Sequence, residues 1–156
     1  MRDGHAATDD ASVLRRSLVG LVVIACAGLT AELLVERHWG TAIRLVPWFA
    51  VAALAYAAFI LMRRPSAGAV RRARLLAGAV MIAAAIGVAL HVYENYVAGP
   101  LDQRYEGVWA GMSEIERWWA AFSKGVGPAP TFAPASLALV ALLLIVATQR
   151  HPALRA

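Results

Sequence analysis

The sequence predicts an all-α fold: an integral membrane four-helix bundle with a short amphipathic helix on its outer face, between the third and fourth spans. Two observations lead to this prediction. Of the 156 residues, 60% are hydrophobic and 16% are charged, whereas about a quarter of the residues in a soluble domain are charged. Four apolar segments also recur along a chain long enough for one domain. The composition argues against a soluble enzyme, a disordered protein and a nucleic-acid-binding protein, and the lipid bilayer is the predicted partner.

Four segments approach the roughly 20 apolar residues that a helix needs to cross about 30 Å of hydrocarbon. The predicted spans cover residues 17–36, 45–62, 75–97 and 131–148. Their apolar residues lie on all sides of the helix, as expected where a helix faces lipid and other helices. The spans form one membrane domain, residues 17–149, between an N-terminal tail, residues 1–16, and a C-terminal tail, residues 150–156.

Cys26 lies inside the first span and is the only cysteine of the chain. Together with the three residues before it, Cys26 has the form of a lipoprotein cleavage box. Apolar residues continue past Cys26 as far as Val35, so an uncleaved span is favoured and a cleaved signal is the alternative. A single cysteine also excludes an intramolecular disulfide and a Cys-x-x-Cys oxidoreductase.

The basic residues predict the orientation, because loops rich in arginine and lysine stay in the cytoplasm. The segment between the second and third spans carries five arginines and no acid: Arg63, Arg64, Arg71, Arg72 and Arg74. Placing this segment and both tails inside gives ten basic and three acidic residues there, against five basic and seven acidic residues outside. The net charge of +5 thus divides into +7 inside and −2 outside. We therefore predict a multi-pass inner-membrane protein with its N-terminus and C-terminus in the cytoplasm.

The outer loop, residues 98–130, is predicted to contain one or two short amphipathic helices. Its large apolar residues recur at three- and four-residue steps between Tyr105 and Phe122, which is a helical period. Ser113 and Glu116 have the spacing of a capping box at a helix start. The tryptophans Trp39, Trp48, Trp109, Trp118 and Trp119 all fall on the predicted outer side, as in an aromatic belt at a membrane interface. The loop is interpreted as a lid over the bundle, with a docking surface for a partner as the alternative.

A cluster of ionisable residues is predicted near the outer boundary, where charged groups inside a membrane are costly and therefore informative. Glu32 lies about 24 Å beyond Arg16 at 1.5 Å per residue. His91 lies about 25 Å beyond Arg74 by the same measure. The two therefore reach a similar depth. The residues of this Glu/His cluster are Glu32, Glu36, His38, His91, Glu94 and Asn95. Carboxylate and imidazole ligands suit zinc, iron or copper, so all six are candidate ligands and a transition-metal ion is the candidate cofactor.

Three functions are open for the Glu/His cluster. In the first, Glu32 and His91 pair and brace the bundle. In the second, the cluster binds a metal ion or small ligand, and the protein serves as an accessory subunit that associates with other membrane subunits. The alternative from a different class is a small proton-coupled transporter that acts as a dimer, with Glu32 as its titrating group. An enzymatic role is not favoured, because the sequence has no phosphate-binding glycine loop and no nucleophile elbow. We therefore assign no catalytic residue.

Short motifs spread along the chain resemble those of a group of small bacterial four-span inner-membrane proteins. The motifs are Ala31-Glu32-Leu33-Leu34, His38-Trp39, Val46-Pro47-Trp48, Gly87 with His91 and Asn95, Pro130 to Pro134, and Arg150-His151-Pro152. The resemblance implies the four-span fold and draws attention to Glu32, His91 and Asn95. In the group, acidic and aromatic residues follow this asparagine closely. In this chain, residues 97–103 lie between Asn95 and those acidic and aromatic residues. The group has no established activity, so the resemblance implies no function.

Overall fold

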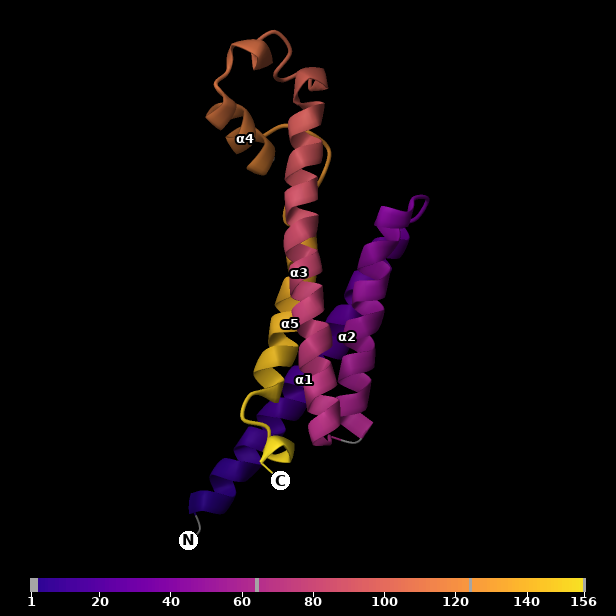
Figure 1. Cartoon of the computed structure of the whole chain (residues 1–156), viewed down its shortest axis with the longest axis vertical. Helices are drawn as coiled ribbons and strands as arrows, with labels where there is room; N and C mark the ends of the chain where they lie inside the picture. Colours follow the sequence, from indigo (N-terminus) through magenta and orange to yellow (C-terminus); the bar gives the residue numbers. More distant parts are fainter. Residues whose placement is uncertain (1–2, 64, 124, 156) are drawn as a thin grey trace. The chain divides into compact units, whose positions relative to one another are not determined.

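The computed structural model describes residues 3–63, 65–123 and 125–155, with side chains from Asp10 onward. Across these residues the regular structure is helical, without strands (Figure 1). The α-helices are α1 (Asp3–Val35), α2 (Val46–Arg63), α3 (Ala67–Ala98), α4 (Glu114–Phe122) and α5 (Ala133–Thr148). The short 3₁₀ helices are η1 (Ala42–Leu45), η2 (Gly99–Leu101), η3 (Trp109–Gly111) and η4 (Pro152–Leu154). The prediction of an all-α fold is confirmed.

Three helical segments are long and apolar enough to cross a membrane: Asp10–Val35, Ala42–Arg63 and Ala67–Leu101. The fourth apolar helix, α5, is shorter, with 16 residues. Pro128 and Pro130 precede it, and proline disfavours helix both at its own position and at the residue before it. Helix α5 therefore starts only at Ala133, with Pro134 in its first turn, where a missing N–H costs least.

Helix α3 begins earlier than the predicted third span, at Ala67 instead of residue 75. Ser66 supports this start, because its Oγ accepts a hydrogen bond from the N–H of Ala69 at 3.2 Å, as a residue preceding a helix commonly does. Most of the arginine-rich segment therefore belongs to the helix and not to a loop. Arg2, Arg64 and Lys124, which entered the charge count, lie outside the described residues, as do the side chains of Asp3 and Asp9.

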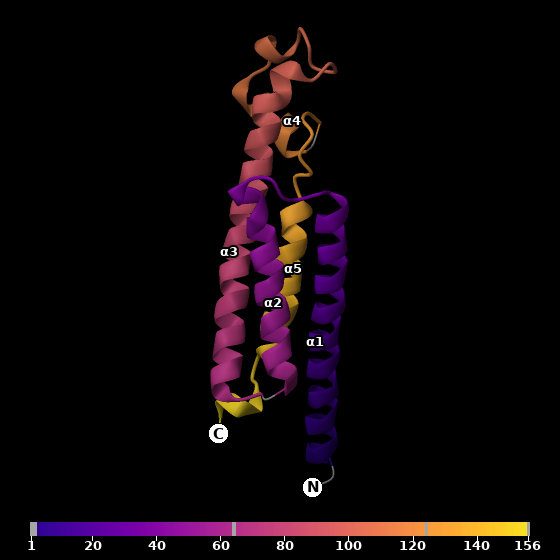
Figure 2. The ribbon, with the colours of Figure 1, turned by 90° about the vertical axis from the view of Figure 1, so that its right-hand side faces the viewer.

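The chain divides into two compact units, and unit 1 comprises residues 1–83 and 137–156. It contains α1, α2, the first half of α3 and most of α5. Helices α1 and α2 pack side by side (Figure 2). Each of the four helices contributes a fully buried apolar residue: Val22, Leu54, Val70 and Leu144. Unit 1 is therefore a helical bundle with an apolar core.

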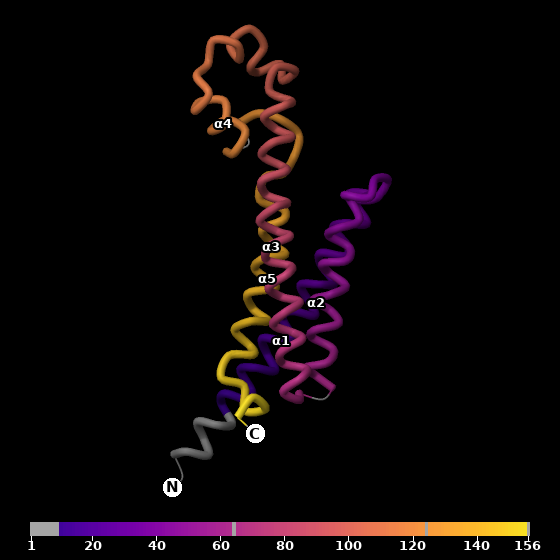
Figure 3. Tube along the Cα trace, viewed as in Figure 1, coloured from indigo at the N-terminus to yellow at the C-terminus, as the bar shows by residue number. Residues whose placement is uncertain are grey.

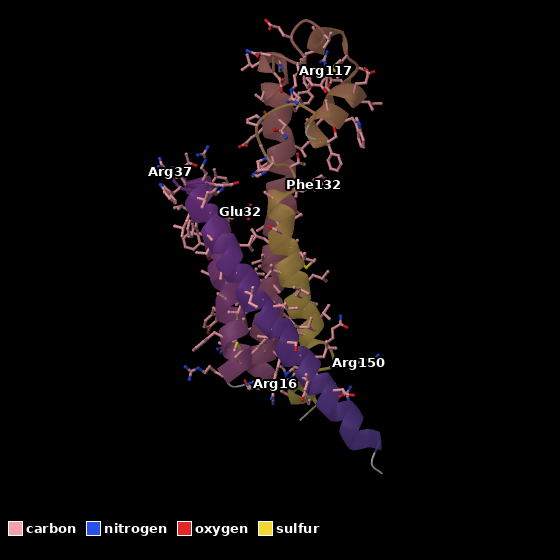
Figure 4. The ribbon with its side chains drawn as sticks, turned by 180° about the vertical axis from the view of Figure 1, so that it is seen from behind. Arg16, Glu32, Arg37, Arg117, Phe132 and Arg150 are labelled. Atoms are coloured by element: carbon pink, nitrogen blue, oxygen red, sulfur yellow. The ribbon has the colours of Figure 1, made fainter. Side chains whose placement is uncertain are left out.

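Basic residues mark one end of unit 1. Arg16 and Arg150 lie at this end, and Glu32 lies at the other (Figure 4). Arg74 of α3 caps α5 there, because its Nη2 donates to the carbonyl oxygen of Thr148 at 2.6 Å and its Nε donates to Thr148 Oγ1 at 3.2 Å. A cation is favourable at this position, since the last carbonyls of a helix lack intrahelical partners. Arg16 of α1, the first turns of α3 and the end of α5 thus lie at one basic end.

Unit 2 comprises residues 84–136 and folds the predicted outer loop into a small region with its own core, whose path can be followed in Figure 3. The buried core residues are Trp109, Ala120, Ala121 and Val126. Tyr96 of α3 stacks on Trp118 of α4 with 4.2 Å between the ring centroids. The predicted capping box at the start of α4 is confirmed, because Ser113 and Glu116 each accept a hydrogen bond from the other's backbone N–H.

Trp109 differs from the predicted aromatic belt, because its side chain is buried. The rings of Tyr96 and Tyr105 meet it edge-on, with centroids at 5.7 and 6.0 Å. Gly99 makes this packing possible, since a Cβ at that position would overlap the indole ring. Trp109 is therefore a core residue of unit 2, whereas Trp118 and Trp119 are exposed.

Candidate functional site

The six residues of the Glu/His cluster divide between the two units. Unit 1 carries Glu32, Glu36 and His38, and unit 2 carries His91, Glu94 and Asn95. Among the described residues, no three His, Cys, Asp or Glu side chains form a group that could hold a metal ion. The cluster therefore has two parts, one in each unit.

The three residues in unit 1 surround the end of α1. Glu32 and Glu36 are exposed on successive turns, and the backbone N–H of Glu36 donates to the carbonyl oxygen of Glu32 at 2.9 Å. The Glu36 carboxylate lies 4.0 Å from Nδ1 of His38. The carbonyl oxygen of His38 accepts a hydrogen bond from Trp48 Nε1 at 2.8 Å, which fixes the connection from α1 to α2. Glu36 and His38 are thus brought together by the local chain path.

Arg37 makes the turn that brings Glu36 and His38 together. Its φ of 49° is in the left-handed region, which a helix end commonly uses but usually fills with glycine. The N–H of His38 then donates back to the carbonyl oxygen of Leu33 at 2.9 Å. Residues with a Cβ, such as arginine, are sterically disfavoured in this conformation. The sequence pattern therefore did not predict a turn at Arg37.

His91 in unit 2 is held in one tautomer by the chain beside it. Its Nδ1 lies 2.8 Å from the carbonyl oxygen of Pro130. A carbonyl oxygen can only accept a hydrogen bond, so Nδ1 carries the proton and the lone pair lies on Nε2. A backbone carbonyl on one ring nitrogen is the usual way in which proteins orient a histidine whose other nitrogen binds a ligand. Nε2 is therefore the ring nitrogen of His91 that could accept a ligand.

Pro130 is brought to His91 by close packing one turn below. A Cβ added to Gly87 would lie 2.9 Å from Cβ of Pro134, which is closer than real side chains approach. Glycine at this position thus allows the start of α5 to lie against α3, as small residues do between membrane helices. Glu94 is exposed one turn from His91 on the same helix, at the three-residue spacing that places two side chains on one face.

Asn95 is fully buried, and its amide is occupied by partners within unit 2. Its Oδ1 accepts from the N–H of Ala129 at 2.8 Å. Its Nδ2 donates toward the carbonyl oxygens of Ala129 and Ala121, at 2.9 and 3.3 Å, and toward Thr131 Oγ1 at 3.2 Å. Asn95 therefore joins α3 to the end of α4 and to the segment before α5, and serves as a clamp. The sequence had placed it among the candidate metal ligands.

A second polar connection closes the predicted outer loop, and sequence reasoning missed it. Asp102 accepts from the backbone N–H, Nε and Nη2 of Arg104, and from the N–H of Gly127 at 3.1 Å. These donors, the Arg104 side chain foremost, hold the pKa of Asp102 well below its usual range. Gly127 has a φ of 83°, and a Cβ there would overlap Asn95. In the sequence, Gly127 directly before Pro128 is the feature that indicates a tight turn at this point.

Comparisons with protein-family models, with curated proteins and with solved structures found no match to this chain. The resemblance to small bacterial four-span membrane proteins therefore stays a prediction. The function has to be argued from the geometry of the site.

Proposed function

We propose that this chain is a multi-pass inner-membrane protein, and that it binds a transition-metal ion or small ligand through His91, at the end of the spans away from the cytoplasm. It acts without catalysis, as an accessory subunit of a larger membrane complex. The three long apolar helices support the membrane assignment, since they match the length that crosses a bilayer. Glu94, exposed one turn from His91 on the same helix, would supply a carboxylate ligand beside it.

The observation that carries the proposal is the hydrogen bond between His91 Nδ1 and the carbonyl oxygen of Pro130. It directs the Nε2 lone pair outward from a backbone anchor, which is the arrangement a neutral imidazole needs to bind a metal. Asn95, by contrast, uses its amide within unit 2. Asn95 therefore braces unit 2, and His91 binds the ligand in this proposal.

The basic end of unit 1 supports the proposed orientation. Arg16 of α1, the first turns of α3 and the end of α5 lie there, and arginine-rich ends stay in the cytoplasm. Both termini would then lie inside, and the end of α1 that bears Glu32 would lie near the outer face. The helices α1, α2, α3 and α5 would be the four spans.

Zinc binding to the full-length protein in phospholipid nanodiscs tests the proposal, with paired substitutions at His91. His91→Asn keeps an N–H near the position of Nδ1, so the bond to Pro130 is retained while Nε2 is lost. His91→Gln places its amide nearer the position of Nε2 and gives up the bond to Pro130. We expect calorimetry to detect zinc binding by the wild type, and His91→Asn to abolish it without lowering the melting temperature.

Two results would contradict the proposal. Zinc binding by His91→Asn at wild-type affinity would remove His91 from the ligand set. Failure of the wild type to bind zinc, combined with proton uptake by proteoliposomes that Glu32→Gln abolishes, would favour the proton-coupled transporter instead. Purification in mild detergent at native expression checks the accessory role, since a clean monomer would count against it.

A further inference from the structure

Helix α4 presents an apolar face that unit 2 leaves uncovered. Its inner face is occupied, because Ala120 and Ala121 are buried in the core. Ile115 and Trp119 are 82% and 66% exposed on the outer face. Trp118 and Phe122 complete this face and line, with Glu114, a shallow groove of about 370 Å³. In water such a contiguous aromatic surface would be unfavourable.

The exposed face of α4 continues directly into the start of α5. The rings of Phe122 and Phe132 meet edge-on with centroids 5.3 Å apart, and Phe132 is 58% exposed one residue before α5 begins. Because α5 is one of the proposed spans, the surface beside Phe132 faces lipid in that proposal. The aromatic face of α4 is then an extension of a lipid-facing surface and not an isolated patch.

The depth of α4 agrees with this. Asn95 donates a hydrogen bond to the carbonyl oxygen of Ala121 at 3.3 Å, so the end of α4 lies beside the α3 turn that contains Asn95. Asn95 follows Arg74 by 21 residues in α3, which is about 31 Å at 1.5 Å per residue. This length of α3 matches a hydrocarbon layer about 30 Å thick, so the Asn95 turn of a spanning α3 would reach the boundary opposite Arg74.

We propose that α4 is an interfacial anchor, whose Ile115, Trp118, Trp119 and Phe122 face inserts into the outer boundary of the bilayer. Tryptophan prefers this region because its ring is largely apolar and its N–H is polar. The occupant of the groove is the upper acyl-chain region of a phospholipid. Residues 98–130 hold four acids and three bases, so they carry no cationic surplus to select an anionic headgroup. This inference rests on the membrane assignment made above.

Site-directed spin labelling of the full chain in phosphatidylcholine nanodiscs tests the anchor. A nitroxide is attached at Ile115→Cys, with Cys26→Ala as background and Trp119→Cys as a second position in case the first does not fold. Glu106→Cys, an exposed loop position of unit 2, is the matched polar control. A label at Leu139→Cys, a position exposed on α5, reports the depth of the proposed span itself. Oxygen partitions into hydrocarbon and a nickel chelate stays in water, so their relative access to the label gives its depth.

We expect the labels at positions 115 and 139 to be several-fold more accessible to oxygen than to the nickel chelate, and the label at position 106 to show the reverse. Replacing part of the phosphatidylcholine with an anionic lipid should leave the label at position 115 unchanged. Aqueous access at position 115 with oxygen access at position 139 would overturn the anchor and leave the membrane assignment intact. Aqueous access at both would overturn the membrane assignment. Spin–spin broadening at position 115, with access to neither reagent, would overturn the lipid as occupant in favour of a second copy of the chain.

Discussion

Replacement of Asn95 by alanine is expected to open unit 2 without disturbing unit 1. Oδ1 of Asn95 accepts one hydrogen bond, and the two N–H groups on its Nδ2 donate toward three oxygen atoms. At about 1 kcal/mol net for each of three bonds, the loss is about 3 kcal/mol. Because Ala129 is buried, its N–H and carbonyl oxygen would be left without a partner, and each unpaired group adds about 1–3 kcal/mol. We expect a loss of at least about 3 kcal/mol in the local stability of unit 2.

Hydrogen–deuterium exchange of the full chain in nanodiscs measures this loss. A change of about 3 kcal/mol corresponds to roughly a hundredfold faster exchange, and it should appear in α4 and in residues 125–131. Buried Trp109 would become hydrated, so its emission should move to longer wavelength. Asn95→Asp should lower the stability of unit 2 at least as much. Its carboxylate keeps the hydrogen bond from Ala129 N–H, but its second oxygen atom would be repelled by the three oxygen atoms that Nδ2 contacts.

The matched control is Glu94→Gln, an exposed position in the same helical turn, where substitutions typically change stability by less than about 0.5 kcal/mol. Exchange in α4 that stays within about twofold of the wild type in Asn95→Ala, with Glu94→Gln equally silent, would refute the clamp. Loss of protection in α1 and α2 as well would refute the claim that the effect is confined to unit 2.

Three further outcomes are expected. Gly127→Ala should destabilise unit 2, because φ is 83° and the new Cβ would overlap Asn95; proteolysis between α3 and α5 that is no faster than in the wild type would contradict this. Hydrogen bonds to Ser113 lower the pKa of Glu116. The capping box therefore stabilises α4 fully at pH values above the ordinary carboxyl pKa, and this stabilisation is lost as the pH falls through the lowered pKa of Glu116. Glu116→Gln should remove this acid sensitivity of hydrogen exchange in α4. Ser66→Cys in a Cys26→Ala background should react with a membrane-impermeant thiol reagent only from the cytoplasmic side, and labelling of intact cells from outside would overturn the orientation.

The positions of the apolar helices could be predicted from the sequence because hydropathy and helical period are local properties. The predicted third span, residues 75–97, lies within α3, and the capping box of α4 was visible as a three-residue spacing. Charge also suggested which ends of the helices belong together, and Arg16 and Arg150 do lie at one end of unit 1. The helices α1 and α3 begin before the predicted spans, at Asp3 and Ala67, since arginine does not break a helix and gives no boundary.

The tertiary structure decided the partners of the polar residues, because those partners lie far away in the sequence. Asn95 meets groups 26 to 36 residues away and His91 meets Pro130, 39 residues away. Depth along the helices could place His91 at the level of Glu32 and Asn95 one turn farther on, but it could not show which atoms each side chain contacts. The same holds for Trp109, which composition assigned to an interface and which packing against Gly99 places in a core. Hydropathy indicates whether a residue prefers water or an apolar environment. Only the folded chain determines which atoms form hydrogen bonds with each buried polar group.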